Sequence, residues 1–372
     1  MNLKKFLAGL IAATCCAGAQ AAEPIKMSCD IQPLAYRNCD SSSCDEGTTV
    51  GKGIQTPFRF VKCDSGCSGN VCDLGCGKNA CDNGCCGNGC DSNGCDGFGG
   101  CDSGLLGLGI VKKSESCYDD FISPMTNPVY FEDPRQLTEA RLIFINHKLP
   151  FLLNNPAGRI QAYAMQVRLR LTEKLSFIAV KDGFVVSDSP LIDDGWLDIS
   201  AGLKYTLYRD ACRGRMLSAG ARFETYSGTP RTLQGNGDGV FDFFLSGGTR
   251  LGSCNHYLGS AGFILPVDDD AENQMFYWSN HLDHQFNRSL YVFTELNWFN
   301  YMSNGNGLPI AGGDLFNFGA PGVKGDNIVT NAYGVKIKPN RNIEMGTAWE
   351  FPMTDFRGTM DNRLTADLII RF

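Results

Sequence analysis

The last ten residues of the chain alternate between apolar and mostly polar side chains. Successive side chains of a β-strand point to opposite faces, so a period of two predicts a strand with one apolar face and one polar face. Counted by twos from the last residue, the apolar face comprises Leu364, Ala366, Leu368, Ile370 and Phe372.

This segment resembles the closing strand of bacterial outer-membrane β-barrels, whose terminal aromatic residue forms part of the assembly signal. The resemblance implies that the apolar face ending at Phe372 is that signal and that the barrel assembly machinery is a partner. It also implies a location in the outer membrane of a Gram-negative-type bacterium, with outer-membrane lipid around the barrel.

Residues 1–21 have the features of a secretory signal peptide. A basic start, an apolar middle and a small-residue cleavage pattern lie at residues 1–5, 6–13 and 19–21. The apolar part is shorter than the roughly 20 residues that a membrane-spanning helix needs. Cys15 and Cys16 raise the alternative of a lipoprotein, but the residues before them match its pattern poorly, and ordinary cleavage is favoured.

The charge of the chain limits its partners. Removing residues 1–21 takes away two lysines and no acid, which moves the formal net charge from -7 to -9. Nucleic-acid binding needs a surplus of Lys and Arg, so nucleic acid is not an expected partner.

Residues 22–120 form a Cys-rich, low-complexity segment that contains fourteen of the eighteen cysteines. Its central part is mostly Gly, Asp, Asn and Ser, which bury too little apolar surface to offset the entropy of ordering the chain. In an exported protein, disulfides are the expected stabilisation. The candidates are Cys63, Cys67, Cys72, Cys76, Cys81, Cys85, Cys86, Cys90, Cys95 and Cys101.

Two other interpretations of this segment remain open. One is a largely disordered linker. The other is a metal site, because several cysteine pairs have three residues between them, a spacing that zinc and soft metals use. The segment has no histidine and no calcium-loop pattern, so the favoured expectation is a disulfide-stapled periplasmic spacer without metal or cofactor.

After a linker at residues 121–136, period-two alternation dominates residues 137–372. Twelve segments show it, at about 137–147, 158–171, 174–186, 196–208, 215–227, 239–251, 256–267, 275–286, 289–300, 328–338, 342–351 and 361–372. These segments are longer than the five or six residues usual for soluble strands, which makes a soluble β-sandwich the less favoured alternative. The pattern predicts an all-β, antiparallel up-and-down transmembrane barrel of about twelve strands, with ten or fourteen also possible.

Connections between these segments alternate between short and long. Short periplasmic turns and long outer loops are typical of outer-membrane barrels, and an even strand number places both termini in the periplasm. The Cys-rich segment would then be periplasmic, where peptidoglycan or another envelope layer is a candidate partner.

Charged residues recur in the middle of the predicted strands on one face. A charge facing lipid costs about 2–4 kcal/mol at the membrane midplane, so this face is expected to line the lumen. The expected lumen-lining residues are Arg168, Arg170, Asp198, Lys204, Arg222, Glu224, Asp242, Arg250 and Glu295. Facing rows of opposite charge would screen and orient ions.

The barrel region also resembles outer-membrane proteins grouped with the transporter-like family named for the meta-pathway of phenol degradation. The likeness lies in the strand pattern, in the stretch at residues 193–205 and in the terminal strand. It implies passage of small solutes across the outer membrane, without an agreed substrate.

Catalysis is not expected. Barrel phospholipases carry a serine two residues after their histidine, whereas His281 is followed by Leu282 and Asp283. His281 and His284 are three residues apart, which on a strand puts them on opposite faces and makes a poor metal pair.

The favoured function is therefore a channel or transporter for small solutes. The long connection at 301–327 carries seven glycines and several apolar residues, and we expect it to fold into the mouth of the barrel. One alternative is a structural barrel that anchors the Cys-rich segment to the cell envelope. Another is a transporter for hydrophobic compounds, which would need an apolar internal pocket where a channel needs a polar lumen.

Overall fold

The computed structural model describes residues 110–151 and 158–372. The predicted signal peptide and the ten candidate disulfide cysteines lie outside these residues, so those expectations stay predictions.

Within the described residues, fourteen β-segments make up the wall, and each is antiparallel to its neighbours. They are β1 (Glu139–Lys148), β2 (Arg159–Arg170), β3 (Leu175–Lys181), β4 (Phe184–Ser187), β5 (Gly195–Trp196), β6 (Ser200–Asp210), β7 (Arg215–Glu224), β8 (Val240–Leu251), β9 (Asn255–Pro266), β10 (Met275–Gln285), β11 (Leu290–Tyr301), β12 (Asn327–Asn340), β13 (Ile343–Pro352) and β14 (Asn362–Arg371). A short 3₁₀ helix, η2 (Pro230–Thr232), lies between β7 and β8.

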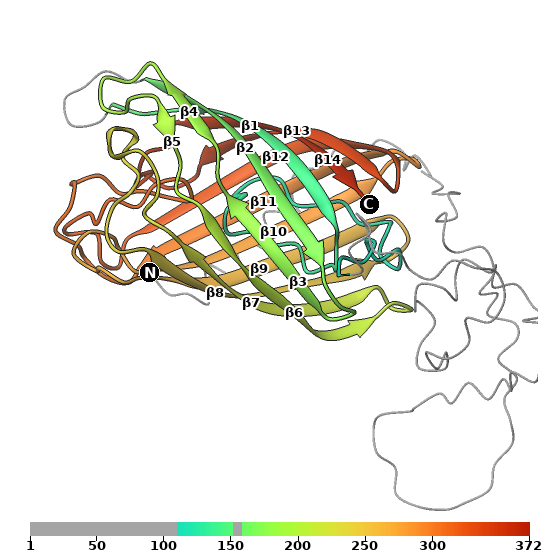
Figure 1. Cartoon of the computed structure of the whole chain (residues 1–372). Helices are drawn as coiled ribbons and strands as arrows, with labels where there is room; N and C mark the ends of the chain where they lie inside the picture. The colour runs from blue at the N-terminus through green and yellow to red at the C-terminus, as the bar shows by residue number, and fades with distance from the viewer. Residues whose placement is uncertain (1–109, 152–157) are drawn as a thin grey trace, which may run out of the picture. The chain divides into compact units, whose positions relative to one another are not determined.

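The sheet closes on itself. Strand β1 pairs with β2 on one side and with β14 on the other, so that Glu139 is opposite both Arg168 and Arg371. Segments β3 and β4 follow one line along β2, and β5 continues into β6. The fourteen segments are therefore the twelve strands of a closed up-and-down barrel, which confirms the predicted fold class and strand number (Figure 1).

A local irregularity separates β3 from β4, where the sequence predicted one strand. Asp182 turns its carboxylate back to accept a hydrogen bond from the backbone amide of Met165, at 2.9 Å. Gly183 follows with a φ of 121°, and a Cβ atom there would lie 2.4 Å from the carbonyl oxygen of Tyr163. The position therefore requires glycine, and the strand is interrupted without opening the wall.

The two faces of the wall differ as a lipid-exposed barrel requires. In β14, Leu364 and Ile370 point outward and are about 40% exposed, whereas Arg363 and Arg371 are buried inside. The same holds around the barrel for large exposed apolar side chains, among them Tyr163, Met165, Leu203, Tyr205, Phe243, Leu245, Phe263, Val335 and Trp349. So large an apolar outer surface is expected only where lipid covers it.

Long and short connections lie at opposite ends of the barrel, as the sequence predicted. The long connections gather at the left end of Figure 1, and the short turns lie at the right end with the C-terminus. Within the described residues, no helix is long and apolar enough to cross a membrane.

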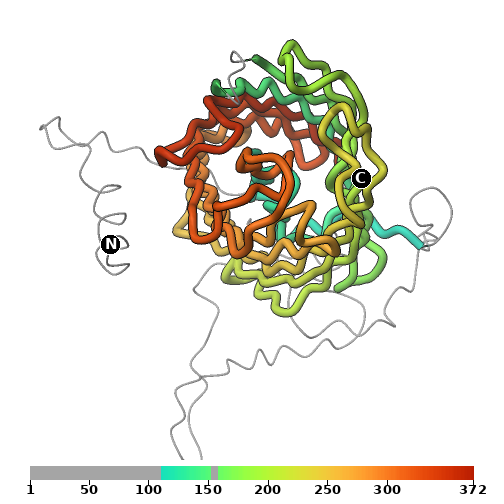
Figure 2. The backbone as a smooth tube through the Cα atoms, turned by 90° about the vertical axis from the view of Figure 1, so that its left-hand side faces the viewer, coloured from blue at the N-terminus to red at the C-terminus, as the bar shows by residue number. Residues whose placement is uncertain are grey.

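The interior is occupied by two segments of the same chain. Residues 114–136, which we call the plug, lie inside the ring of strands, and residues 302–326, which we call the mouth loop, fold into the end with the long connections (Figure 2). Every residue of 121–136 is buried. The sequence suggested only a linker there, because the contacts that bury this segment come from strands far along the chain.

Candidate functional site: the plugged lumen

Basic side chains of the wall hold the plug by its backbone carbonyl groups. The ammonium group of Lys204 on β6 donates to the carbonyl oxygen of Arg135 at 2.8 Å and also to that of Asp133. Lys338 on β12 donates in the same way to the carbonyl oxygen of Phe121, at 2.9 Å. Four more wall side chains donate to carbonyl oxygens of the plug: Arg222 to Val129, Gln166 to Pro128, Ser218 to Pro134 and Ser246 to Glu132.

One plug carboxylate is held between two of these wall cations. Glu132 receives two parallel bonds from the guanidinium group of Arg168, both at 2.9 Å, and a third from Lys204 at 2.9 Å. All three side chains are buried. Burial opposes the charged carboxylate, but Arg168 and Lys204 outweigh it and lower the pKa of Glu132 to about 2.

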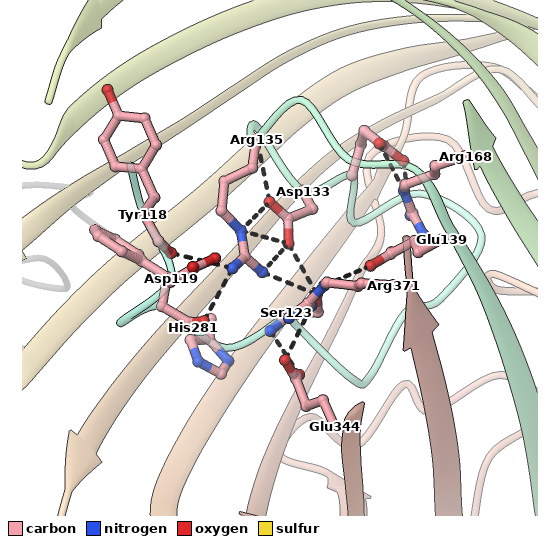
Figure 3. A network of polar contacts seen from close by, with 12 residues as sticks. Tyr118, Asp119, Ser123, Asp133, Arg135, Glu139, Arg168, His281, Glu344 and Arg371 are labelled. Carbon is pink, nitrogen blue, oxygen red and sulfur yellow. Dashed lines mark hydrogen bonds and ion pairs between the residues drawn. The ribbon is translucent and has the colours of Figure 1, made fainter. Parts of the chain in front are cut away.

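The plug is also cross-linked to itself. The Arg135 guanidinium group forms an ion pair with Asp133, at 2.7 Å, and donates to the hydroxyl of Ser123 and to the carbonyl oxygen of Phe121, both at 2.9 Å (Figure 3). Although burial acts in the other direction, Arg135 holds the pKa of Asp133 well below its usual value. This arrangement links Asp133 and Arg135 to the part of the plug around Phe121 and Ser123.

The end of the last strand reaches the same place. Arg371 on β14 forms ion pairs with Glu139 at 2.8 Å and with Glu344 at 2.9 Å, and it donates to the hydroxyl of Ser123 at 2.7 Å. Glu344 in turn accepts the backbone amide of Ser123 at 2.8 Å. The closing strand of the barrel and the plug therefore share one polar network (Figure 3).

A chain of alternating carboxylates and imidazoles runs along the wall on strands β9 to β11. Asp120 of the plug contacts Nε2 of His256 at 3.1 Å, and Nδ1 of His256 contacts Asp283 at 2.7 Å. Asp283 then contacts Nε2 of His281 at 3.3 Å, and Nδ1 of His281 contacts Glu295 at 2.6 Å. We call these five residues the histidine chain.

The histidine chain begins and ends on the plug. At its far end, Glu295 accepts the backbone amides of Met125 and Thr126, at 2.7 and 2.6 Å. At its near end, Asp120 is also bound by the guanidinium group of Arg250, with Nη2 at 2.9 Å. The wall therefore binds the plug at two points, and the histidine chain connects these two points.

The structure places the nine expected lumen residues as follows. Arg168, Lys204, Arg222, Arg250 and Glu295 contact the plug directly. Arg170 lies at the end with the short turns and binds the carbonyl oxygen of Lys113, and Asp242 pairs with Arg222. Glu224 pairs with Lys181, while Asp198 accepts backbone amides of the connection between β7 and β8, from Gly228 and Gly235.

The lumen changes character towards the mouth. There Ile310, Leu315, Phe316 and Phe318 of the mouth loop are buried in an apolar core with inward side chains of the wall. Arg363 anchors the loop through two bonds to Asp314, at 2.7 and 2.8 Å. The mouth loop is thus packed mainly by apolar side chains, whereas around the plug the polar network is accompanied by small apolar clusters, one of which contains Phe121 and Leu258 and another Met125 and Phe293.

Glu272, in the connection between β9 and β10, is a buried acid. Only 6% of it is exposed, and within the described residues its Oε2 atom has no hydrogen-bond partner. Burial and the nearby Glu224 raise the pKa of Glu272 to about 8. The folded protein then keeps a proton that the unfolded chain loses above its ordinary pKa, so stability falls as the pH rises to about 8.

We therefore expect Glu272→Gln to remove this pH slope and to stabilise the protein by roughly 1–3 kcal/mol above the pKa of the native acid. Thermal unfolding on either side of that pKa measures the slope. Asp269→Asn, at an exposed neighbour, is the control, and a slope that persists in Glu272→Gln would contradict the assignment.

Several residues of the site were not identified from the sequence. Asp283, Lys338, Glu344 and Arg363 occupy the polar faces of their strands, so the same alternation that identified Glu295 could have found them. The plug has no such period, and no sequence signal marks it. Among the described residues, no group of three or more His, Cys, Asp or Glu side chains is arranged to hold a metal ion.

A closed barrel of twelve antiparallel strands with an apolar outer face and a charged interior defines the class of this protein. It is a transmembrane β-barrel of the outer-membrane type.

No family model and no curated protein matches the chain. Among solved structures, it is similar to an outer membrane channel from Pseudomonas putida F1, at 13% identity over 68% of this chain and 100% of the channel, with a TM-score of 0.47. The NanC porin is 6% identical over 63% of this chain and 98% of the porin, with a TM-score of 0.41. The KdgM porin is 10% identical over 62% of this chain and 99% of the porin, with a TM-score of 0.39.

Proposed function

We propose that this protein is an outer-membrane channel for small solutes and that the plug closes it at rest. The observation that carries the proposal is the way the lumen is filled. Around the plug, polar bonds and small apolar clusters join a separate chain segment to the wall, whereas wall side chains in contact with one another would form a permanent core. A segment held by such side-chain contacts can leave without breaking the pairing of any strand.

A barrel of twelve strands need not conduct, because side chains can largely fill its interior. The structural alternative, an anchor for the Cys-rich segment, is favoured by one observation: the lumen is occupied from both ends. The two functions differ in one respect, namely whether the plug leaves the lumen under native conditions.

Glu295→Ala tests the proposed function. The variant removes the acceptor of two buried plug amides, those of Met125 and Thr126. Each unpaired buried donor costs about 1–3 kcal/mol, so the plug equilibrium should shift towards the open state by roughly tenfold or more. Single-channel recording of the full chain in planar bilayers should show rare openings in the parent and frequent openings in the variant.

Thr294→Ala is the matched control, because Thr294 is the neighbouring residue on the opposite face of β11 and binds the carbonyl oxygen of Ala332. It should behave like the parent. Silence of both the parent and Glu295→Ala, with the barrel folded, would favour the anchor.

A further inference from the structure

We propose that the opened lumen selects anions and that Arg168 and Lys204 form a carboxylate-binding site in its wall, which Glu132 fills while the plug is in place. The ligands would be small solutes that carry a carboxylate. This inference deepens the proposed function and rests on it for the anion selectivity, while the binding site can be tested without conduction.

The geometry of the site is that of a carboxylate receptor. Nε and Nη2 of Arg168 donate to the two oxygens of Glu132 in parallel, and Lys204 approaches one of these oxygens from a second strand. A planar guanidinium fork matches the two oxygens of a carboxylate, and the lysine adds a point charge. The plug thus presents the same group that a carboxylate-bearing solute would present.

Loss of the plug would leave this site short of negative charge. Among the described residues, every hydrogen-bond acceptor of the Lys204 ammonium group belongs to the plug: the Glu132 carboxylate and the carbonyl oxygens of Asp133 and Arg135. Arg168 would keep Glu139, at 3.2 Å. A buried ammonium group without an acceptor is unfavourable, so an anion from solution should replace Glu132.

The charge of the wall that faces the plug points the same way. Among the strand residues that bond to the plug, the acidic ones are Glu295 and Glu344, and the basic ones are Arg141, Arg168, Lys204, Arg209, Arg222, Arg250, Lys338 and Arg371. The plug carries five acidic residues and one basic residue. In the closed state the acidic plug offsets the basic excess of the wall, and in the open state that excess faces the solute. A pore lined by surplus positive charge favours anions.

The first test measures ion selectivity in the full chain. Arg135→Ala serves as the open background, because the side-chain partners of Arg135 lie in the plug and the wall keeps its charges. In a gradient of potassium chloride, the reversal potential should show preference for chloride, and adding Lys204→Met should reduce the chloride-to-potassium permeability ratio by roughly twofold or more. Lys324→Met, an exposed lysine of the mouth loop, is the control that should leave the ratio unchanged.

Glutarate provides the carboxylate probe in the same recordings, with uncharged glutaramide as its control. Glutarate should reduce the chloride current in Arg135→Ala and should have a much weaker effect after Lys204→Met. Currents that prefer potassium, or a glutarate effect that Lys204→Met does not change, would overturn the inference and leave the channel itself standing.

A second test does not depend on conduction. Glu132→Ala in the full chain removes the acetate-sized end of the side chain and leaves Arg168 and Lys204 facing the vacated space. Acetate should raise the thermal midpoint of this variant more than chloride does, and the difference should vanish in the double variant with Lys204→Met. Equal effects of acetate and chloride on Glu132→Ala would overturn the site, even if no variant conducts.

Discussion

Replacing Arg135 with alanine is expected to open the barrel more than any other single change in the plug. The variant leaves the carboxylate of Asp133 buried without its partner, and it also removes donors from Ser123 and from the carbonyl oxygen of Phe121. Removing one member of a buried ion pair costs about 3–5 kcal/mol. Since 1.4 kcal/mol corresponds to a factor of ten, the plug equilibrium should shift by at least roughly a hundredfold.

Two measurements can detect this shift of the plug equilibrium. The open fraction in planar bilayers should rise steeply. Arg168, which in the closed state is buried inside the wall against Glu132, should become reactive towards a guanidine-modifying reagent added to the folded protein. Lys113→Ala, at an exposed residue just before the plug, is the control for loss of a positive charge. A variant with closed channels and a protected Arg168 would show that the Asp133–Arg135 pair does not hold the plug.

Raising the pH is expected to release the plug through the histidine chain. Both ring nitrogens of His256 and of His281 face carboxylate oxygens. A neutral imidazole has a single N–H group, so both contacts can be hydrogen bonds only when the ring is protonated. With two imidazolium ions and Arg250, the three carboxylates of the chain are balanced.

The sign of the pH effect follows from this count. The closed state needs a proton on His256, because this ring contacts Asp120 of the plug as well as Asp283, and in the open state the contact with Asp120 is lost. The closed state therefore binds this proton more tightly and loses its advantage as the pH rises. The partners of His281, Asp283 and Glu295, both lie on the wall. On the acid side, burial acts against ionisation, but hydrogen bonds from His256 and Arg250 hold the pKa of Asp120 well below its usual value. Mild acid therefore leaves the contact intact, and closure is expected from mildly acidic to neutral solution.

Open probability measured from about pH 5 to about pH 10 tests this expectation, with openings increasing at the alkaline end. The double variant His256→Gln and His281→Gln should make the profile flat. His284→Gln is the control, because His284 binds Asn255 and takes no part in the histidine chain. A pH profile that the double variant does not change would assign the response to other groups.

The wall of the barrel could be predicted from the sequence because its signal is local. The segment predicted at 239–251 is β8 at Val240–Leu251, and that predicted at 256–267 is β9 at Asn255–Pro266. Each strand repeats apolar and polar residues with a period of two. This repeat suits a wall whose outer face contacts lipid and whose inner face contacts a charged interior. Glu295 was placed in the lumen for the same reason.

The plug and its contacts were decided by the tertiary structure. Glu132 lies 36 residues from Arg168, and Ser123 lies 248 residues from Arg371, so no local pattern relates the partners. No role for His281 was evident from the sequence, because its partners Asp283 and Glu295 surround the ring only when β10 and β11 pair. A repeat with a period of two can be recognised from neighbouring residues alone. The contacts inside the lumen depend on which distant side chains the closed sheet brings together.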